Sequence, residues 1–168
     1  KCSADILDFI RGRLDAQLRE KYPAEFVAAC IGVSDDPCET AGKVEAFSKV
    51  SAEGKDRWLT LLRTAKRAYN IVKSEKNIVP LNAAGFVQEE ERALFQAFKD
   101  WQNHVRQMPE RKYSDRLRAI LQMAPHLQRF FEKVFVMVDD ANLRNNRLAL
   151  IKTISDAFRS YAEFDKIA

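Results

Sequence analysis

Apolar residues recur at intervals of three and four along nearly the whole chain, which is the spacing of one face of an α-helix. Because only five Gly and five Pro interrupt the 168 residues, the sequence predicts an all-α fold. The most regular apolar stripe lies in a predicted helix in the middle of the first half. Its members are Trp58, Leu61, Leu62, Ala65, Tyr69 and Val72.

The same spacing predicts further helices on both sides of this stripe. The first has one apolar face; the third is expected to begin with Asp36 as N-cap, Pro37 in the first turn and Glu39 closing a capping box. Pro125 is expected to end one helix, and the spacing of the residues after it favours a new helix over a strand. The apolar face of the first helix consists of Ile6, Ile10, Leu14 and Leu18. The expected ranges of these further helices are about 6–18, 26–31, 36–50, 88–107, 113–124, 126–138 and 140–163.

One long connection, SEKNIVPLNAAGF at residues 74–86, divides the chain into two helical halves. Neither half alone has much core, so we expect a single domain over residues 1–168. The chain begins with Lys1 and shows no targeting pattern, which favours a domain excised from a longer chain.

The composition is that of a globular protein, with 46% apolar and 31% charged residues. A cytoplasmic location is expected. No apolar run approaches the roughly 20 residues of a membrane span, so no membrane association is expected. Cys2, Cys30 and Cys38 lack metal-ligand spacing and are expected to be free thiols. The net charge of +4 is compatible with a nucleic-acid partner but is also common in proteins without one.

No pattern of a catalytic site is present. The chain contains no glycine-rich phosphate loop, and its two histidines, His104 and His126, fall in different predicted helices. The acidic run 89–91 is explained by the positive end of a helix dipole. We therefore expect no catalytic residue, metal site or cofactor in this chain.

Two groups of basic residues are candidate contacts with a nucleic acid. The first lies on one third of the circumference of the helix that carries the regular apolar stripe, where it could follow a phosphate backbone. The alternative is a solvated face with scattered ion pairs. Its members are Arg63, Lys66, Arg67, Asn70 and Lys73.

The second group lies at the start of the last predicted helix. Arg147 falls among its apolar positions, and a buried guanidinium is costly unless its donors are paired. We expect Arg147 to lock this helix to a neighbour. Asp139 or Asp140 would be the N-cap, and the other of the two, or Glu132, would accept from Arg147. The alternative is that Arg147 reaches a phosphate. Arg144, at the edge of the face, is the better candidate for a ligand contact.

These residues carry a family resemblance. The stretch from Phe130 to Leu150 resembles the C-terminal signature of the bacterial glycyl-tRNA synthetase β subunit, which runs FFDxVMVMxxDxxxRxNRLALL. Phe135 and Glu132 stand where that pattern has Met and Asp. The opening ILDFIRGRLDAQLRE is similar to the family's first helix, KRAYNIVK to its KRxxNILK, and AEFDKI to its ADFSKI ending. Residues 74–88 match only loosely.

The resemblance implies an α-helical bundle of the DALR anticodon-binding type, taken from the C-terminal end of the parent chain. It implies a domain that binds the anticodon arm of glycine tRNA. Glycine activation with ATP and magnesium would occur elsewhere, on an α subunit or a fused catalytic part. It also favours the phosphate-binding reading of the first basic group. Two alternatives remain: a helical docking module for subunit assembly, and a small regulatory enzyme, which the missing catalytic patterns disfavour.

Overall fold

The computed structural model describes the backbone of residues 2–75 and 78–167, with side chains from Ile6 onward. Within these ranges the chain forms seven α-helices, two short 3-10 helices and no strand, which confirms the all-α prediction. The α-helices are α1 (Cys2–Arg19), α2 (Ala24–Cys30), α3 (Pro37–Glu53), α4 (Lys55–Val72), α5 (Glu89–Gln107), α6 (Tyr113–Lys133) and α7 (Ala141–Arg159); the 3-10 helices are η1 (Ala83–Gly85) and η2 (Phe164–Lys166).

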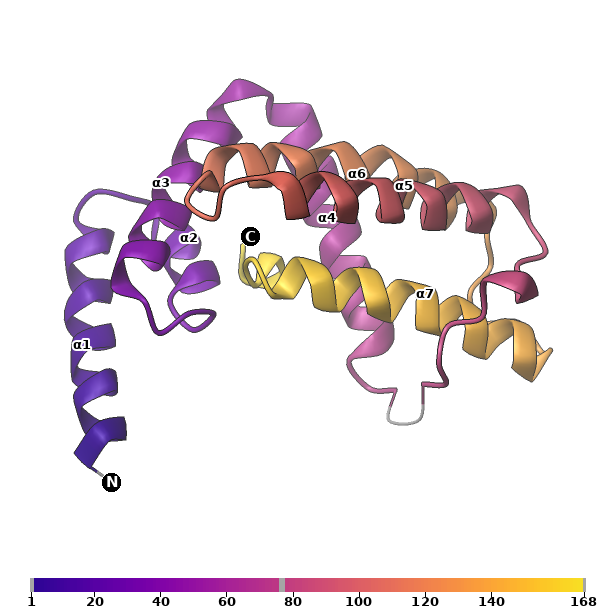
Figure 1. Cartoon of the computed structure of the whole chain (residues 1–168), viewed down its shortest axis with the longest axis horizontal. Helices are drawn as coiled ribbons and strands as arrows, with labels where there is room; N and C mark the ends of the chain where they lie inside the picture. Colours follow the sequence, from indigo (N-terminus) through magenta and orange to yellow (C-terminus); the bar gives the residue numbers. More distant parts are fainter. Residues whose placement is uncertain (1, 76–77, 168) are drawn as a thin grey trace.

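The long helix α6 is the centre of the arrangement. It packs against α3, α4 and α5, and α4 in turn packs against α7 and η2. In Figure 1, α5 and α6 run side by side, α7 lies below them, and α4 crosses steeply behind. The amino-terminal α1 stands at one end, where it packs against α2 and α3.

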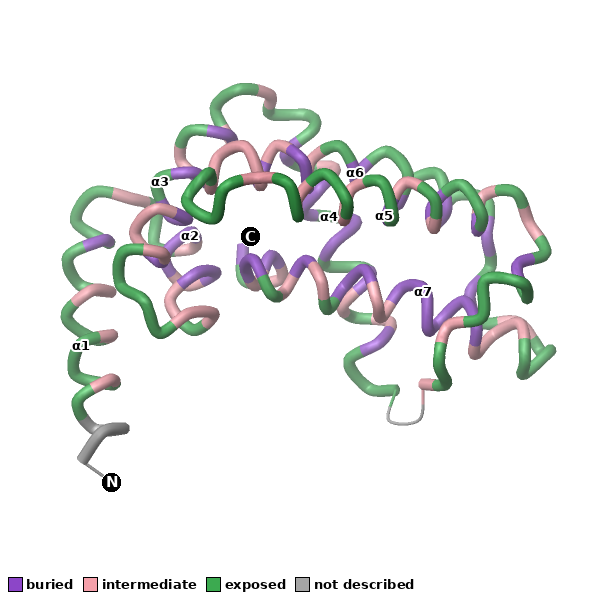
Figure 2. Tube along the Cα trace, viewed as in Figure 1, coloured by how far each residue is buried: buried purple, intermediate pink, exposed green. Residues whose placement is uncertain are grey.

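The core is built from the apolar stripes that the sequence predicts. Trp58 and the other stripe residues of α4 are buried, with Tyr69 half-buried at the edge. Phe47 is fully buried in an aromatic cluster: its ring centroid lies 5.7 Å from that of Phe26, 5.4 Å from that of Trp58 and 5.5 Å from that of Phe164. Burying each such ring stabilises the fold by roughly 1.5–3 kcal/mol. Figure 2 shows the buried positions along the inner sides of α4 and α7.

The prediction for the start of α3 is confirmed in part. Asp36 caps the helix by accepting from the Cys38 amide at 2.8 Å, with Pro37 in the first turn. The predicted capping box is wrong, because Glu39 instead accepts from Ser34 Oγ at 2.7 Å and pairs with Lys43 Nζ at 2.7 Å. Hydrogen bonds from Lys43 and Ser34 lower the pKa of the Glu39 carboxyl.

The predicted helix boundary at Pro125 is wrong, since α6 continues through it to Lys133. A proline inside a helix removes one hydrogen bond and costs about 3 kcal/mol. The buried stripe of α6 runs without interruption past this position, so packing on both sides offsets that cost. The stripe residues that span it are Leu117, Ile120, Met123, Ala124, Leu127 and Phe130.

The helix predicted to reach Val138 ends instead at Lys133. In the segment that follows, Val134 and Val136 are buried while Phe135 and Met137 are exposed, which is the alternation of an extended chain. The last helix is likewise shorter than predicted: α7 ends at Arg159 and is followed by η2. The reason is that the Glu163 amide turns away to donate to the Ala29 carbonyl at 2.8 Å.

The predicted apolar face of α1 is buried only at its carboxyl end. Leu18 is buried and Leu14 half-buried, whereas Ile6 and Ile10 are exposed, as is the neighbouring Phe9. Cys30 and Cys38 are free thiols, as predicted, and the side chain of Cys2 lies outside the described residues. Among the described helices, none has the length and apolar character that a membrane span requires.

Candidate nucleic-acid interface

The first basic group forms a continuous exposed strip along α4. Its buried stripe faces α6 and α7, so the opposite side of the helix points to solvent. We call these residues the α4 strip; all five are exposed, as the helical spacing predicts. Its members are Arg63, Lys66, Arg67, Asn70 and Lys73.

The cations of the α4 strip have few partners within the protein. Arg63 Nη2 lies 3.4 Å from Thr60 Oγ1, and Lys73 Nζ donates to Asn70 Oδ1 at 2.8 Å. None of the strip's cations forms an ion pair with a residue that the structure describes. Their charge is therefore available to an outside anion.

Arg67 is positioned by an aromatic ring. Its Cζ lies 4.6 Å from the ring centroid of Phe131, a residue of α6 that is itself buried. The cation–π attraction restrains a guanidinium that lies over a ring, while the side chain of Arg67 stays exposed at the surface. Tyr69, in contrast, is covered by another cation, since Arg159 Cζ lies 4.2 Å from its ring centroid.

A groove of about 210 Å³ runs between the α4 strip and α6. We call it the α4–α6 groove. Both arginines of the strip line it, and on the α6 side Gln128 Nε2 donates to Glu132 Oε1 at 2.8 Å. The groove thus presents donors from α4 opposite a carboxylate from α6. Its lining is Thr60, Arg63, Thr64, Arg67, Gln128, Phe131 and Glu132.

The second basic group, at the start of α7, is largely committed to the fold. Asp140 is the N-cap, as predicted, and accepts from the amides of Asn142 and Leu143 at 2.9 and 3.0 Å. The half-buried Arg144 donates through Nη1 to the Val138 carbonyl at 2.7 Å and lies 3.4 Å from the Asp139 carbonyl. Part of its donor capacity therefore holds the turn before α7.

Arg147 is buried, with 4% of its residue surface exposed, which confirms the prediction of a lock. The predicted acceptors are wrong, because Asp139, Asp140 and Glu132 accept no hydrogen bond from it. Its Nε donates to Glu91 Oε1 at 2.7 Å, its Nη1 to the Phe135 carbonyl at 2.7 Å and its Nη2 to Gln88 Oε1 at 3.1 Å. The guanidinium thus joins α7 to the start of α5 and to the extended segment after α6.

Glu91 is the partner that the sequence did not reveal. Its carboxylate is fully buried, and Oε2 accepts from the amides of Val87 and Gln88 at 2.8 and 2.6 Å. A buried carboxylate that accepts from three donors compensates a buried guanidinium well. The acidic run 89–91 had a sufficient local explanation in the helix dipole, so nothing in the pattern marked Glu91 as buried.

Asn146 completes this joint. Its Oδ1 accepts from the Asn82 amide and its Nδ2 donates to the Asn82 carbonyl, both at 2.9 Å, so it substitutes for a backbone partner. Gly85 in η1 lets the loop approach closely, because a Cβ there would lie 3.1 Å from Asn146 Nδ2. We call Glu91, Asn146 and Arg147 the α7 joint. It anchors the predicted long connection, residues 78–87 of which are described.

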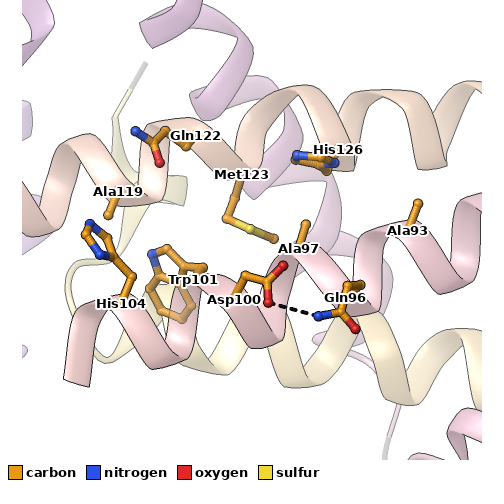
Figure 3. A pocket seen from close by; sticks show the side chains of 10 residues that line it. All are labelled: Ala93, Gln96, Ala97, Asp100, Trp101, His104, Ala119, Gln122, Met123 and His126. Atoms are coloured by element: carbon orange, nitrogen blue, oxygen red, sulfur yellow. Dashed lines mark hydrogen bonds between the residues drawn. The ribbon is translucent and has the colours of Figure 1, made fainter. Parts of the chain in front are cut away.

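A larger groove, of about 700 Å³, lies between α5 and α6 (Figure 3). His104 and His126, which the sequence placed in different helices, stand at opposite ends of it, and Gln96 Nε2 donates to Asp100 Oδ1 at 2.8 Å. The lining contains no Lys or Arg. Within the described part of the chain, no group of three or more His, Cys, Asp or Glu side chains could hold a metal ion.

Comparisons with known proteins agree with this architecture. The glycine–tRNA ligase β subunit of Geotalea daltonii is 37% identical over 98% of this chain, that of Geotalea uraniireducens 34% over 97%, and that of Myxococcus xanthus 34% over 96%. The chain spans about a quarter of the length of these relatives, 24% in each case. The family model of the DALR anticodon-binding domain matches residues 59–163, from within α4 to just beyond the end of α7. The chain therefore belongs to the DALR anticodon-binding domain family.

Proposed function

We propose that this chain binds the anticodon arm of a glycine tRNA, as part of a glycine–tRNA ligase β subunit in the cytoplasm. The observation that supports it best is the α4 strip, whose four cations are exposed and form no ion pair within the described residues. Family membership and the names of the relatives supply the tRNA and the amino acid. In this proposal the chain itself carries no catalytic group.

In the proposed mechanism the α4 strip contacts phosphates and fixes the position of the anticodon loop. Each neutralised phosphate releases counterions, so binding weakens as salt rises. Arg144 is a second proposed contact, through the donors that Val138 and Asp139 leave free. Glycine activation with ATP and magnesium would take place in the rest of the ligase, on an α subunit or a fused part. Most of the length of each relative lies outside the match.

The test is fluorescence anisotropy with a labelled anticodon stem-loop of a glycine tRNA at several salt concentrations. Lys66→Ala and Arg67→Ala should each weaken binding and reduce the slope of log affinity against log salt by about 0.7–1. Lys49→Ala on α3 removes the same charge from an exposed position outside the strip and is the matched control. Parental affinity of both strip variants at every salt concentration would refute the assignment.

A helical docking module is the second candidate function. The exposed apolar residues Ile6, Phe9 and Ile10 on α1 favour it, because such a face is common at protein interfaces. Salt-insensitive association with an α subunit, unchanged in Lys66→Ala, would support this function. A stem-loop with a swapped anticodon separates the two, since a docking module has no reason to prefer the cognate loop.

A further inference from the structure

Glu132 is an acidic residue at a place where a surface that only binds phosphates would be expected to carry none. It lines the α4–α6 groove opposite Arg63 and Arg67, and its carboxylate is exposed. Within the described residues it forms no ion pair, so its negative charge persists beside the strip. A carboxylate there repels a phosphate backbone, whereas it accepts hydrogen bonds readily from an amino group.

The groove has the parts that single-stranded RNA recognition requires. Proteins that read unpaired bases stack them on aromatic rings or on guanidinium planes and hydrogen-bond their Watson–Crick edges. Arg67 supplies a guanidinium for such stacking, held with its Cζ 4.6 Å from the centroid of the Phe131 ring. At about 210 Å³ the groove is smaller than the roughly 300–1,000 Å³ of pockets for drug-sized ligands, which suits a single planar base.

The polar groups select among the bases. Cytosine presents an N4 amino donor beside ring acceptors, and a carboxylate is the side chain that accepts from N4. The groove offers that carboxylate on α6 and guanidinium donors for the ring acceptors on α4. Uracil carries an oxygen in place of the amino group, so the carboxylate would repel it. Gln128 donates to Glu132 Oε1, which leaves Oε2 as the free acceptor.

We propose that the α4–α6 groove is a subsite for one unstacked cytosine of the bound RNA, with Glu132 as the residue that recognises its amino group. This inference rests on the proposed function and adds a specificity residue to it. Glycine codons begin with two guanosines, so the anticodon that pairs with them contains two cytidines. One of these is the expected occupant.

The test measures discrimination rather than affinity alone. Labelled stem-loops carrying either anticodon cytidine replaced by uridine are compared with the unmodified loop. For one of the two positions the parental chain should bind the uridine loop about fivefold or more weakly. Glu132→Gln should reduce that ratio to near one, because an amide can face either base. Glu45→Gln on α3 removes the same charge elsewhere and should leave the ratio unchanged.

The outcomes separate the two proposals. If Glu132→Gln tightens binding to all loops equally and leaves the ratio intact, the carboxylate only repels phosphates, and the cytosine subsite is refuted while the strip stands. If Arg67→Lys, which keeps the charge but lacks a plane, binds the unmodified loop as tightly as the parental chain, stacking on Arg67 is refuted. If the parental chain shows no salt-sensitive binding to any of the RNA stem-loops, the proposed function itself is refuted.

Discussion

The α4 strip and the α7 joint contain the same kind of residue in opposite situations. Arg63 and Arg67 are exposed and form no ion pair within the described residues, whereas Arg147 is buried and all three of its nitrogens donate to partners in the protein. A guanidinium with free donors can bind an outside anion, and one whose donors are spent inside supports the fold. Burial and partners, rather than residue type, separate the binding candidates from the structural ones.

The largest expected effect comes from breaking the α7 joint. Arg147→Met leaves the Glu91 carboxylate buried without its cation, so unfolding in urea should show a loss of about 3–5 kcal/mol. The slope of RNA affinity against salt should stay at the parental value where the variant is folded, because no strip cation is lost. The double variant Arg147→Met with Glu91→Gln should recover part of the loss. A loss below about 1 kcal/mol would mean that Arg147 is not buried as described.

A smaller effect is expected at the cap that begins α7. Asp140→Ala removes the acceptor for two backbone amides and should cost about 1 kcal/mol in the free energy of unfolding. The adjacent Asp139→Ala is a matched control, since its side chain accepts no hydrogen bond from a described residue; it should change stability by less than about 0.5 kcal/mol. Equal losses in both variants would contradict the assignment of Asp140 as the cap.

The smallest effect on stability is expected in the strip itself. Lys66→Ala should change the free energy of unfolding by less than about 0.5 kcal/mol, because the side chain is exposed and has no described partner. The same variant should lose RNA affinity. Lys66→Ala is thus expected to change binding and not stability, whereas Arg147→Met is expected to change stability and not the salt dependence of binding. Should Lys66→Ala destabilise the chain as strongly as Arg147→Met, the distinction between strip and joint would fail.

The charge of a groove matters more than its size in this comparison. The α5–α6 groove has more than three times the volume of the α4–α6 groove, about 700 against 210 Å³, yet no Lys or Arg lines it. Both grooves share α6 as a wall, with Met123 on one side and Phe131 on the other. A polyanion is therefore expected at the smaller one.

Local patterns predicted much of the fold. The periodicity of α4 placed both its buried stripe and its exposed strip correctly, because a helix fixes which residues share a face. The burial of Arg147 followed from the same reasoning. The prediction of a separate helix after Pro125 was wrong. The apolar spacing from Ile120 through Leu127 to Phe130 continued across the proline and indicated one helix.

The partners of the α7 joint could not be predicted in the same way. Glu91 lies 56 positions from Arg147 and Asn82 lies 64 from Asn146, so only the tertiary fold brings them together. The contact at Phe135 is likewise set by the tertiary fold, since its carbonyl accepts from Arg147, 12 positions away. The roles predicted for the α4 strip and for Arg144 in binding tRNA stay predictions.

The α7 joint also has a consequence for the timing of local motion. One turn of α7 fastens the loop at Asn82, the start of α5 at Gln88 and the segment at Phe135. None of these segments can open alone without breaking a bond to that turn. We therefore expect the three segments to exchange their amide hydrogens as one cooperative unit, with a shared free energy of opening.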